Sequence, residues 1–283
     1  MATEGGVAKA CHVEHAPAKI NLTLHVTGQR ADGYHLLDSL VVFADLGDRL
    51  TLTPAATPAL SVAGPMAAGV PAGADNLVLR AAQVMGVALD IRLDKHLPAA
   101  AGIGGGSSDA AAVLRGVLAL RPDKTLPVDN GLSLGADVPV CLVARAARMR
   151  GIGEQVSPVD GLPPLHAVLV NPRVSVSTAV IFRTLARRDN TPMPAVLPPW
   201  ADAVELAVWL AAQRNDMQAA AIVAVPVVGQ VIASIAATQG CLLARMSGSG
   251  ATCFGLFADA DSAAHAAQSL AGTGWWVKAV RLR

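Results

Sequence analysis

The chain has 283 residues, of which 53% are hydrophobic and only 15% are charged, and its formal net charge is +1. This composition excludes a disordered chain, which lacks the apolar residues needed for a core. The near-neutral charge and the 3% content of aromatic residues argue against a protein that binds nucleic acid electrostatically or by base stacking. We therefore expect a globular protein with no nucleic-acid partner.

High hydropathy raises the question of a membrane span. The longest uncharged stretch runs over residues 217–244, and a spanning helix needs about 20 apolar residues. Pro226 and scattered polar residues predict instead two helices that break near residues 224–226. We expect no membrane partner. Residues 1–15 lack the apolar core of a signal peptide, and the cysteines show no paired spacing, so a cytoplasmic protein with free thiols is expected.

Periodicity predicts an α+β protein. Strands are expected at residues 18–26, 36–45, 49–53, 91–95, 167–171, 241–244 and 253–257, and helices at 76–87, 108–120 and 178–188. Strands and helices mix without the strict alternation of a doubly wound sheet. The length favours two lobes, and a cluster of glycine, proline and polar residues at 151–161 predicts their boundary. We expect lobes at residues 1–150 and 151–283.

A glycine-rich segment at residues 97–111 carries the strongest chemical signal. Four glycines within five residues precede the helix expected to start near Ser107 and Ser108. Glycines allow a ligand to approach the backbone closely, and the first N–H groups of a helix attract anions. No lysine follows the last glycine, so the segment is not a Walker A loop. The pattern favours a phosphate-binding loop, with an ordinary strand-to-helix turn as the alternative.

Other residues give weaker signals. A second glycine loop at residues 245–252 lies between two predicted strands, and this pattern by itself indicates a hairpin turn. Lys19 stands on the polar face of the first predicted strand, where most lysines are simply solvated. Asp137 is a lone acid in an apolar run, and Pro139 after it fits the first turn of a helix, so Asp137 could be an N-cap. From their patterns alone these alternatives stay open.

Tyr34 and His35 occupy a polar turn. An aromatic ring beside an imidazole suits stacking on a nucleobase and hydrogen bonding to its edge, although a plain turn fits as well. The remaining histidines show no metal-ligand spacing, so we expect no structural zinc site.

Together these segments resemble the GHMP kinases. Residues 16–22, 98–111 and 246–251 are similar to the three motifs of that family. Residues 28–35 and 134–139 resemble the branch that phosphorylates a cytidine-diphosphate-linked erythritol on the non-mevalonate route to isoprenoid precursors. The motifs occur in the expected order, and their joint occurrence is specific.

The resemblance implies a two-lobed fold, with an N-terminal lobe like ribosomal protein S5, a C-terminal α/β lobe and the active site between them. It implies ATP-dependent phosphorylation of the 2-hydroxyl of 4-(cytidine 5′-diphospho)-2-C-methyl-D-erythritol, with ATP and Mg²⁺ as cofactors and the metal ligands unassigned. The implied ATP-binding residues are Pro98, Ala99, Ala100, Ala101, Gly102, Ile103, Gly104, Gly105, Gly106, Ser107 and Ser108.

The resemblance also implies roles for individual side chains. Asp137 would accept the proton of the 2-hydroxyl, and Lys19 beside it would hold that carboxylate in its charged form and stabilise the transferred phosphoryl group. The cytosine would stack between Tyr34 and Phe182, and His35 would read its edge. The remaining substrate contacts would come from Asn21 and Thr178.

Three alternatives remain. Another GHMP kinase, acting on homoserine, mevalonate or a sugar, would have no use for Tyr34, His35 and Phe182. A catalytically silent relative that binds ATP or a metabolite as a regulator would not need both Lys19 and Asp137. A nucleic-acid binder of similar fold is disfavoured by the near-zero charge.

Overall fold

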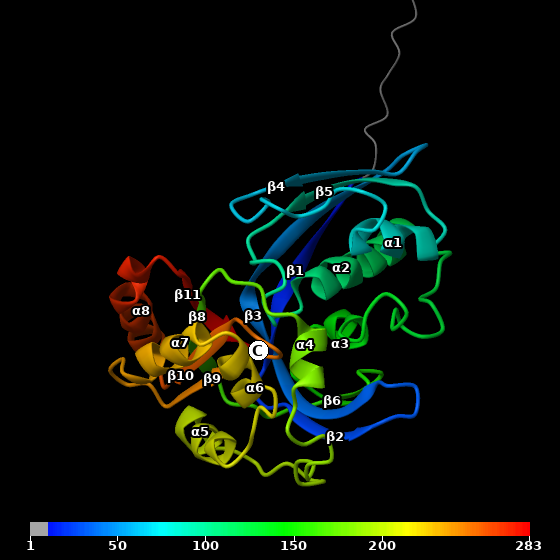
Figure 1. The fold of residues 1–283 in the computed structure, drawn as a ribbon. Helices are drawn as coiled ribbons and strands as arrows, with labels where there is room; N and C mark the ends of the chain where they lie inside the picture. The colour runs from blue at the N-terminus through cyan, green and yellow to red at the C-terminus, as the bar shows by residue number, and fades with distance from the viewer. Residues whose placement is uncertain (1–10) are drawn as a thin grey trace, which may run out of the picture.

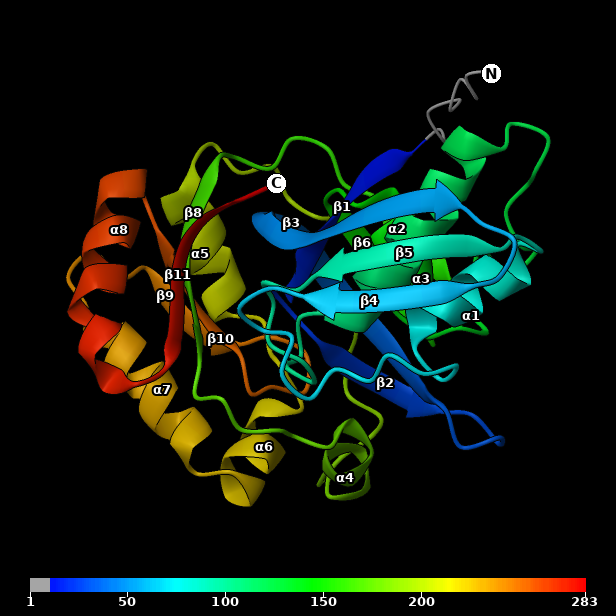
Figure 2. The same ribbon diagram turned by 90° about the horizontal axis from the view of Figure 1, so that it is seen from above.

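The computed structural model describes residues 11–283. The part of the signal-peptide expectation that concerns residues 1–10 lies outside the described residues. Strands run through the centre of the molecule, and helices cover them in two groups, one in each half of the chain (Figures 1 and 2). This is the α+β, two-lobed arrangement that the sequence predicts.

The N-terminal half is a sheet covered by helices. Its strands are β1 (His12–Asn21), β2 (His25–Gln29), β3 (His35–Pro54), β4 (Ala59–Ala63), β5 (Leu89–Asp94), β6 (Ala147–Gly151) and β7 (Gln155–Pro158). Its helices are α1 (Leu77–Val84), α2 (Gly105–Leu120) and α3 (Val138–Val143).

The C-terminal half continues the same sheet. Its strands are β8 (Leu165–Asn171), β9 (Leu243–Met246), β10 (Cys253–Phe257) and β11 (Trp276–Leu282). Its helices are α4 (Thr178–Arg183), α5 (Ala203–Ala211), α6 (Gln218–Ala224), α7 (Val227–Ala236) and α8 (Ala260–Ser269), followed by the 3₁₀ turn η1 (Ala271–Thr273).

The long strand β3 connects the two halves. The main path through the sheet runs β4-β5-β3-β11-β8-β10-β9, and β1, β2 and β6 also pair with β3. Near the chain end, Leu282 of β11 pairs with Ala44 of β3, and the C-terminus lies beside β3 in Figure 2. Both lobes are therefore attached to one strand, which fixes the cleft between them.

Both faces of β3 are buried. Val41 and Phe43 face the core formed with α1, α2 and α3, whereas Leu40 and Val42 face the core shared with β8, β10 and α5. A strand buried on both faces is a continuous apolar run rather than an alternating one, which explains the apolar sequence of this segment.

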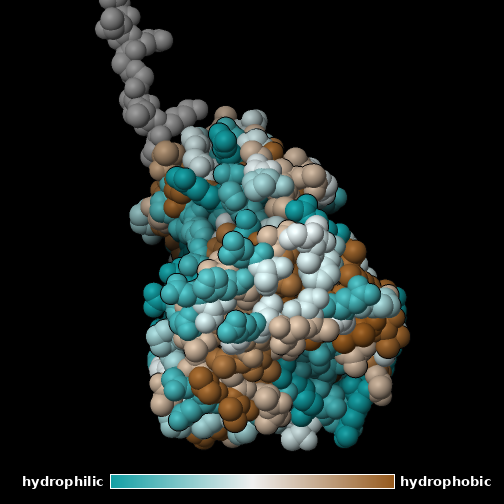
Figure 3. All heavy atoms as spheres, turned by 90° about the vertical axis from the view of Figure 1, so that its left-hand side faces the viewer, coloured by the Kyte–Doolittle hydropathy of each residue, from teal (hydrophilic) through white to brown (hydrophobic). Residues whose placement is uncertain are grey.

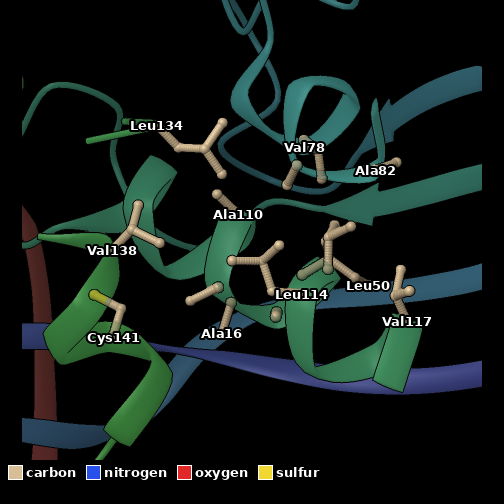
Figure 4. Packing of buried hydrophobic residues seen from close by; sticks show 14 of the residues in the cluster. Ala16, Leu50, Val78, Ala82, Ala110, Leu114, Val117, Leu134, Val138 and Cys141 are labelled. Carbon is tan, nitrogen blue, oxygen red and sulfur yellow. The ribbon is translucent and has the colours of Figure 1, made fainter. Parts of the chain in front are cut away.

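Helix α2 lies at the centre of the first core. Its inner face is rich in small residues, which lets it pack closely against β1 and α3. Figure 4 shows its side chains among those of the neighbouring elements: Ala110, Leu114 and Val117 of α2 with Ala16, Leu50, Val78, Leu134 and Val138. This packing holds the start of α2, which faces the cleft, against a rigid support.

Several predicted elements have different bounds. Residues 18–26 divide between β1 and β2, because Thr23 Oγ1 accepts the N–H of Leu40 at 2.8 Å and turns the chain there. The strands predicted at 36–45 and 49–53 are one strand, β3. The predicted helix 178–188 ends at Arg183, where the Thr184 hydroxyl bonds to the carbonyl oxygens of the last turn.

The helix break predicted near residues 224–226 is confirmed, since α6 ends at Ala224 and α7 begins at Val227. The strand predicted at 241–244 lies two residues later, as β9. Strands β4, β6, β7 and β11 were not predicted. β6 spans the predicted lobe boundary at 150–151 and pairs with both β3 and β7, and that boundary remains a prediction.

The described surface has separate apolar areas. Figure 3 shows hydrophobic residues in patches divided by hydrophilic ones on the side of the C-terminal helices. Val204 and Val208 on α5 and Val223 on α6 are among the exposed apolar side chains. Within residues 11–283, no helix combines the length and the apolar character needed to cross a bilayer.

Candidate active site

Strand β1 places Lys19 and Asn21 at the cleft. The pairing of β1 with β3 shifts register between Pro17 and Lys19, and such a bulge redirects the side chains that follow it. Ala18 and Ile20 are buried in the core between the lobes, so the alternating residues Lys19 and Asn21 face the other way. Lys19 is only 3% exposed, which contradicts the solvated alternative considered for it.

The glycine-rich segment ends at the N-terminus of α2. Gly104 is the N-cap residue, in the left-handed conformation with φ of 63°, and no side chain caps the helix. The N–H groups of the first helical turn lack partners within a helix. Lys19 N donates to Ile103 O at 2.9 Å and so ties the loop to β1. The start of α2 is therefore free to bind an anion in the cleft.

Asp137 and Lys19 form a direct ion pair. Asp137 is the N-cap residue of α3, but its carboxylate makes no capping hydrogen bond. Its Oδ2 instead accepts a hydrogen bond from Lys19 Nζ at 2.8 Å. The Asp137 side chain is 30% exposed while that of Lys19 is 4% exposed. A buried ammonium thus supports a carboxylate that reaches the cleft.

This ion pair adjoins the start of α2. A Cβ atom placed on Gly104 would lie 3.3 Å from Cβ and Cε of Lys19 and 3.7 Å from Oδ2 of Asp137. The absence of a side chain at residue 104 therefore lets the helix terminus approach the ion pair. A cation, a carboxylate and the first N–H groups of a helix are brought together at one point.

The second glycine loop interlocks with the first. It joins β9 and β10, which pair as an antiparallel hairpin. Ser247 Oγ donates to Gly102 O at 3.0 Å, and Thr252 N donates to Ala101 O at 3.1 Å. A Cβ on Gly102 would come within 2.7 Å of backbone atoms of this hairpin. The two loops can approach this closely only because each has glycine at the contact.

These elements enclose one cavity of about 360 Å³. Its floor and walls combine the ion pair, both glycine loops and an apolar side formed by α4 and neighbouring residues. Among the sequence-predicted residues, those lining it are Lys19, Asn21, Ala100, Ala101, Gly102, Gly104, Gly105, Gly106, Ser107, Asp137, Thr178 and Phe182. Residues far apart in sequence therefore converge on one site.

Other predicted residues lie outside the lining. Ser108 is fully buried, and its hydroxyl donates to Pro17 O at 2.8 Å. Ile103 is in the core, and Pro98 is buried behind the loop. Ala99 is exposed at the loop surface. The backbone of the loop thus forms the cavity wall, whereas these side chains anchor or flank it.

The predicted aromatic residues gather only in part. The rings of His35 and Phe182 stack, with centroids 4.3 Å apart and planes 11° from parallel. Tyr34 is 58% exposed. Of these three residues only Phe182 lines the cavity, and His35 lies beside the lining through its contact with Phe182. Burial, with Arg188 adding to it, lowers the pKa of His35, so that this ring is neutral at neutral pH. Its buried Nε2 has no hydrogen-bond partner among the described residues.

Asn21 and Thr178 offer polar groups at the cavity. Asn21 Nδ2 donates to Ser39 Oγ at 2.8 Å, while the buried Oδ1 has no partner within the described chain. An unpaired buried acceptor is costly unless a ligand donor meets it. Thr178 Oγ1 lies 2.7 Å from Ser249 Oγ. Both residues can therefore recognise hydroxyl groups of a ligand.

Two further residues support the site: Asn215, which with Asp216 fits the pattern of the resembled kinases, and Arg245, which begins the second glycine loop. Asn215 Nδ2 donates to Met246 O at 2.8 Å and to Gly248 O at 2.9 Å, which holds the second glycine loop in place. Arg245 is buried and donates to Leu22 O at 2.9 Å and to Leu210 O at 2.8 Å, and burial lowers its pKa to about 10. Only tertiary contacts define these roles.

Comparisons with known proteins show the family to which the chain belongs. The family model for the N-terminal domain of GHMP kinases matches residues 76–145, and that for their C-terminal part matches residues 200–274. A 4-diphosphocytidyl-2-C-methyl-D-erythritol kinase from Dinoroseobacter shibae is 60% identical over 271 residues, which cover 95% of this chain and 94% of that protein. The chain belongs to the 4-diphosphocytidyl-2-C-methyl-D-erythritol kinase family. It is an enzyme, a phosphotransferase of the GHMP kinase group.

A solved structure supports the same assignment, and a more distant one shares the fold. The crystal structure of a 4-(cytidine 5′-diphospho)-2C-methyl-D-erythritol kinase has a TM-score of 0.78 and 34% identity, and the match covers 96% of this chain and 99% of that one. A mevalonate kinase from L. major has a TM-score of 0.65 at 16% identity, with 97% of each chain covered. The more distant structure shows only that the GHMP kinase fold is shared.

Proposed function

We propose that this enzyme transfers the terminal phosphoryl group of ATP to the 2-hydroxyl of 4-(cytidine 5′-diphospho)-2-C-methyl-D-erythritol. The supporting observation is the placement of the Lys19–Asp137 ion pair against Gly104, at the start of α2. Phosphoryl transfer requires mainly positioning and charge stabilisation. The site offers a base, a cation and a set of N–H donors at one point.

The triphosphate would bind along the first glycine loop. The N–H groups of Gly105, Gly106 and Ser107 begin α2 and line the cavity. Backbone N–H groups and the positive end of the helix dipole favour a phosphate there. Gly248 and Ser249 of the second loop form the facing wall. The terminal phosphate would then meet the ion pair beside Gly104.

Asp137 would act as the general base. Lys19 occupies Oδ2, so we assign Oδ1 to the hydroxyl of the acceptor. As the alcohol oxygen attacks the phosphorus, its proton passes to this carboxylate. General-base catalysis requires the carboxylate to lie within hydrogen-bond distance of that hydroxyl. The Lys19 ammonium stabilises negative charge on the transferred group.

Magnesium would enter with ATP as part of the substrate. Among residues 11–283, no three His, Cys, Asp or Glu side chains are grouped so that they could hold a metal ion. Mg²⁺ commonly keeps several waters and binds substrate phosphates rather than an all-protein cage. Among the residues that line the cavity, Asp137 is the one with an anionic side chain. The phosphate oxygens of ATP and water would therefore supply most of the magnesium ligands.

The acceptor would occupy the apolar side of the cavity. Phe182 offers a ring face for a nucleobase and His35 a neutral ring with an unpaired nitrogen. The His35 ring covers one face of Phe182. The nucleobase must therefore displace the His35 ring or stack on the outer face of that ring. Asn21 and Thr178 would contact the polyol. A cytidine-bearing acceptor uses all of these groups, whereas homoserine, mevalonate or a sugar does not.

An ADP-release assay with a panel of acceptors tests this function. The panel contains the cytidyl-linked erythritol, homoserine, mevalonate and galactose, each with ATP and Mg²⁺. We expect turnover with the cytidyl compound and background release with the others. Equal or greater turnover with any other acceptor would overturn the substrate assignment, and no turnover with any of them would favour a silent relative.

A further inference from the structure

A buried cluster of three charged side chains lies beneath the first glycine loop. Asp48 comes from β3, Lys95 follows β5, and Asp109 belongs to α2. Lys95 Nζ donates to Asp109 Oδ2 at 2.8 Å and also contacts Asp48 Oδ2. All three side chains are buried. One ammonium ion thus joins two carboxylates out of contact with solvent, and none of the three lines the cavity.

The cluster fastens both ends of the loop. Asp48 Oδ1 accepts the N–H of His96 at 2.6 Å and the N–H of Leu97 at 2.9 Å, where the loop begins. Asp109 lies in α2 just after the loop ends. A Cβ on Gly105 would lie 3.7 Å from Lys95 Nζ, so the ammonium is directly behind the first helical residue. Movement of the cluster would therefore displace the N–H groups that face the cavity.

The charges of this cluster do not balance. With every group ionised, two carboxylates and one ammonium carry one net negative charge, and an uncompensated buried charge is costly. Oδ1 of Asp109 has no hydrogen-bond partner among the described residues. Burial raises the pKa of Asp109 to about 7, with Lys95 opposing this shift and Asp48 adding to it. Asp109 is thus the group of the cluster that most readily takes a proton.

Other charged groups on the elements around α2 are neutralised or exposed. The paired groups are Lys19 of β1 with Asp137 at the start of α3, Arg115 of α2 and His12 of β1 with Glu14 of β1, and Asp38 of β3 with Arg148 of β6. The exposed groups are His15 of β1, Asp45 and Arg49 of β3, and Arg80 of α1. The thiol of Cys141 on α3 stays protonated, because burial raises its pKa. The charge on Asp109 therefore responds to Lys95, Asp48 and any ligand on the loop above.

We propose, on the basis of the ATP site in the proposed function, that Asp48, Lys95 and Asp109 position the phosphate loop and that Asp109 takes up a proton when ATP binds. The triphosphate brings negative charge to the start of α2 and disfavours a second ionised carboxylate below it. The proton comes from solvent and stays on Asp109, while no bond of ATP changes. Lys95 and Asp48 then remain as a balanced pair.

Calorimetry with ATP and excess Mg²⁺ tests the proton uptake. Titrations in two buffers of different ionisation enthalpy should show that the wild-type protein takes up about half a proton per ATP at pH 7. Asp109→Asn keeps the shape of the neutral carboxyl and should abolish that uptake. The wild-type Kd for ATP should rise with pH above 7 by up to about tenfold per unit, and the variant's should not. Equal uptake in the two proteins would overturn the proposal.

A second readout needs no variant. The infrared difference spectrum of wild-type protein on binding ATP should show a carboxylate band lost and a protonated carboxyl band gained. If Asp109→Asn does not fold, the wild-type spectrum still tests the proposal. Carboxyl and carboxylate bands that do not change when ATP binds would contradict proton uptake by Asp109.

Lys95→Met tests the positioning role. We expect it to raise the Kd for ATP by at least about tenfold while changing the KM of the alcohol substrate less than twofold. Arg148→Met is the matched control, because it also removes a buried cation from a carboxylate, Asp38, but away from the loop. It should destabilise the protein without weakening ATP binding. Equal effects of the two variants on the Kd for ATP would show a merely structural role.

These experiments separate the inference from the proposed function. Proton uptake is measured with ATP alone, without an acceptor alcohol. If ATP binds with proton uptake but the cytidyl compound is not phosphorylated, the assignment of the acceptor is wrong and the role proposed for the buried cluster is still supported. If the cytidyl compound is phosphorylated but ATP binding takes up no proton, the role proposed for the buried cluster is wrong and the proposed function is still supported.

Discussion

Lys19 Nζ donates a 2.8 Å hydrogen bond to Asp137 Oδ2 across 118 residues of sequence. β1 carries the lysine, and the aspartate begins α3. Both lie against Gly104 at the head of α2. The ion pair therefore exists only because the first core packs β1, α2 and α3 together, and its geometry should respond to small changes at their meeting point.

Gly104→Ala should impair catalysis more than stability. The left-handed backbone at φ of 63° makes alanine unfavourable there by about 1–2 kcal/mol, and the new Cβ would press on the Lys19 side chain. We expect kcat to fall at least about tenfold, measured by steady-state phosphoryl transfer.

Gly69→Ala provides the matched control for that variant. Gly69 has φ of +78° but nothing within 4 Å of an added Cβ, so it carries the same backbone strain without the contact. Its kcat should stay near the wild-type value. A similar loss of kcat in both variants would mean that the approach of Lys19 to Gly104 is unimportant.

Phe182→Ala should weaken binding of the acceptor selectively. Stacking on a nucleobase contributes about 1–3 kcal/mol, so the KM of the cytidine-bearing substrate should rise roughly ten- to hundredfold. The KM of ATP should change less than twofold. Val180→Ala, at an exposed residue of the same helix, is the control. An equal rise in both KM values after Phe182→Ala would argue against base stacking.

The pH dependence of acceptor binding should follow His35. Burial and Arg188 lower the pKa of His35, so the ring is neutral above its ordinary pKa of about 6.5 and for some way below it. The acceptor KM should be constant at neutral pH and change only as acid protonates the ring. Arg188→Gln removes one lowering influence and should move that change to higher pH. An unmoved profile would exclude His35 as the titrating group.

Asp109→Asn should alter how stability depends on pH. The folded pKa of Asp109, about 7, lies above its unfolded value of about 3.8, so the folded protein binds the proton more tightly. The raised pKa of Asp109 therefore lowers the unfolding free energy of the wild-type protein progressively as pH rises from about 4 to 7. The unfolding free energy of the variant, relative to wild type, should be higher at pH 8 than at pH 5. A difference independent of pH would contradict the raised pKa.

The sequence predicts those parts of the site that depend on local backbone. The glycine-rich segment and the hairpin between β9 and β10 have local conformational signatures, and the hairpin joins the two strands that the pattern predicts. Helix α2 begins at Gly105, earlier than the start predicted near Ser107 and Ser108, so only Gly102 and Gly104 precede it. Pro226 likewise marks the break between α6 and α7. Local rules suffice where a residue type restricts its own backbone.

The remaining features depend on tertiary contacts. Lys19 alternates with buried residues like a solvated lysine, and only the packing of α3 gives it a partner. Strand β3 looks like two strands because Gly47 interrupts it, and an added Cβ there would come within 2.7 Å of Ala16 backbone atoms. The contact of His35 with Phe182 joins β3 to α4. No periodicity in a single segment encodes these pairings.

The rate of phosphoryl transfer by Asp137→Asn tests the central assignment most directly. Acid–base catalysis contributes about 10²–10⁴-fold, so kcat with the cytidyl compound should fall by at least that lower factor while the Kd for ATP stays within twofold. Asp160→Asn, at a side chain 91% exposed, should match wild type in both. Wild-type kcat in the Asp137→Asn enzyme would contradict a base at this position and, with it, the catalytic role of the ion pair.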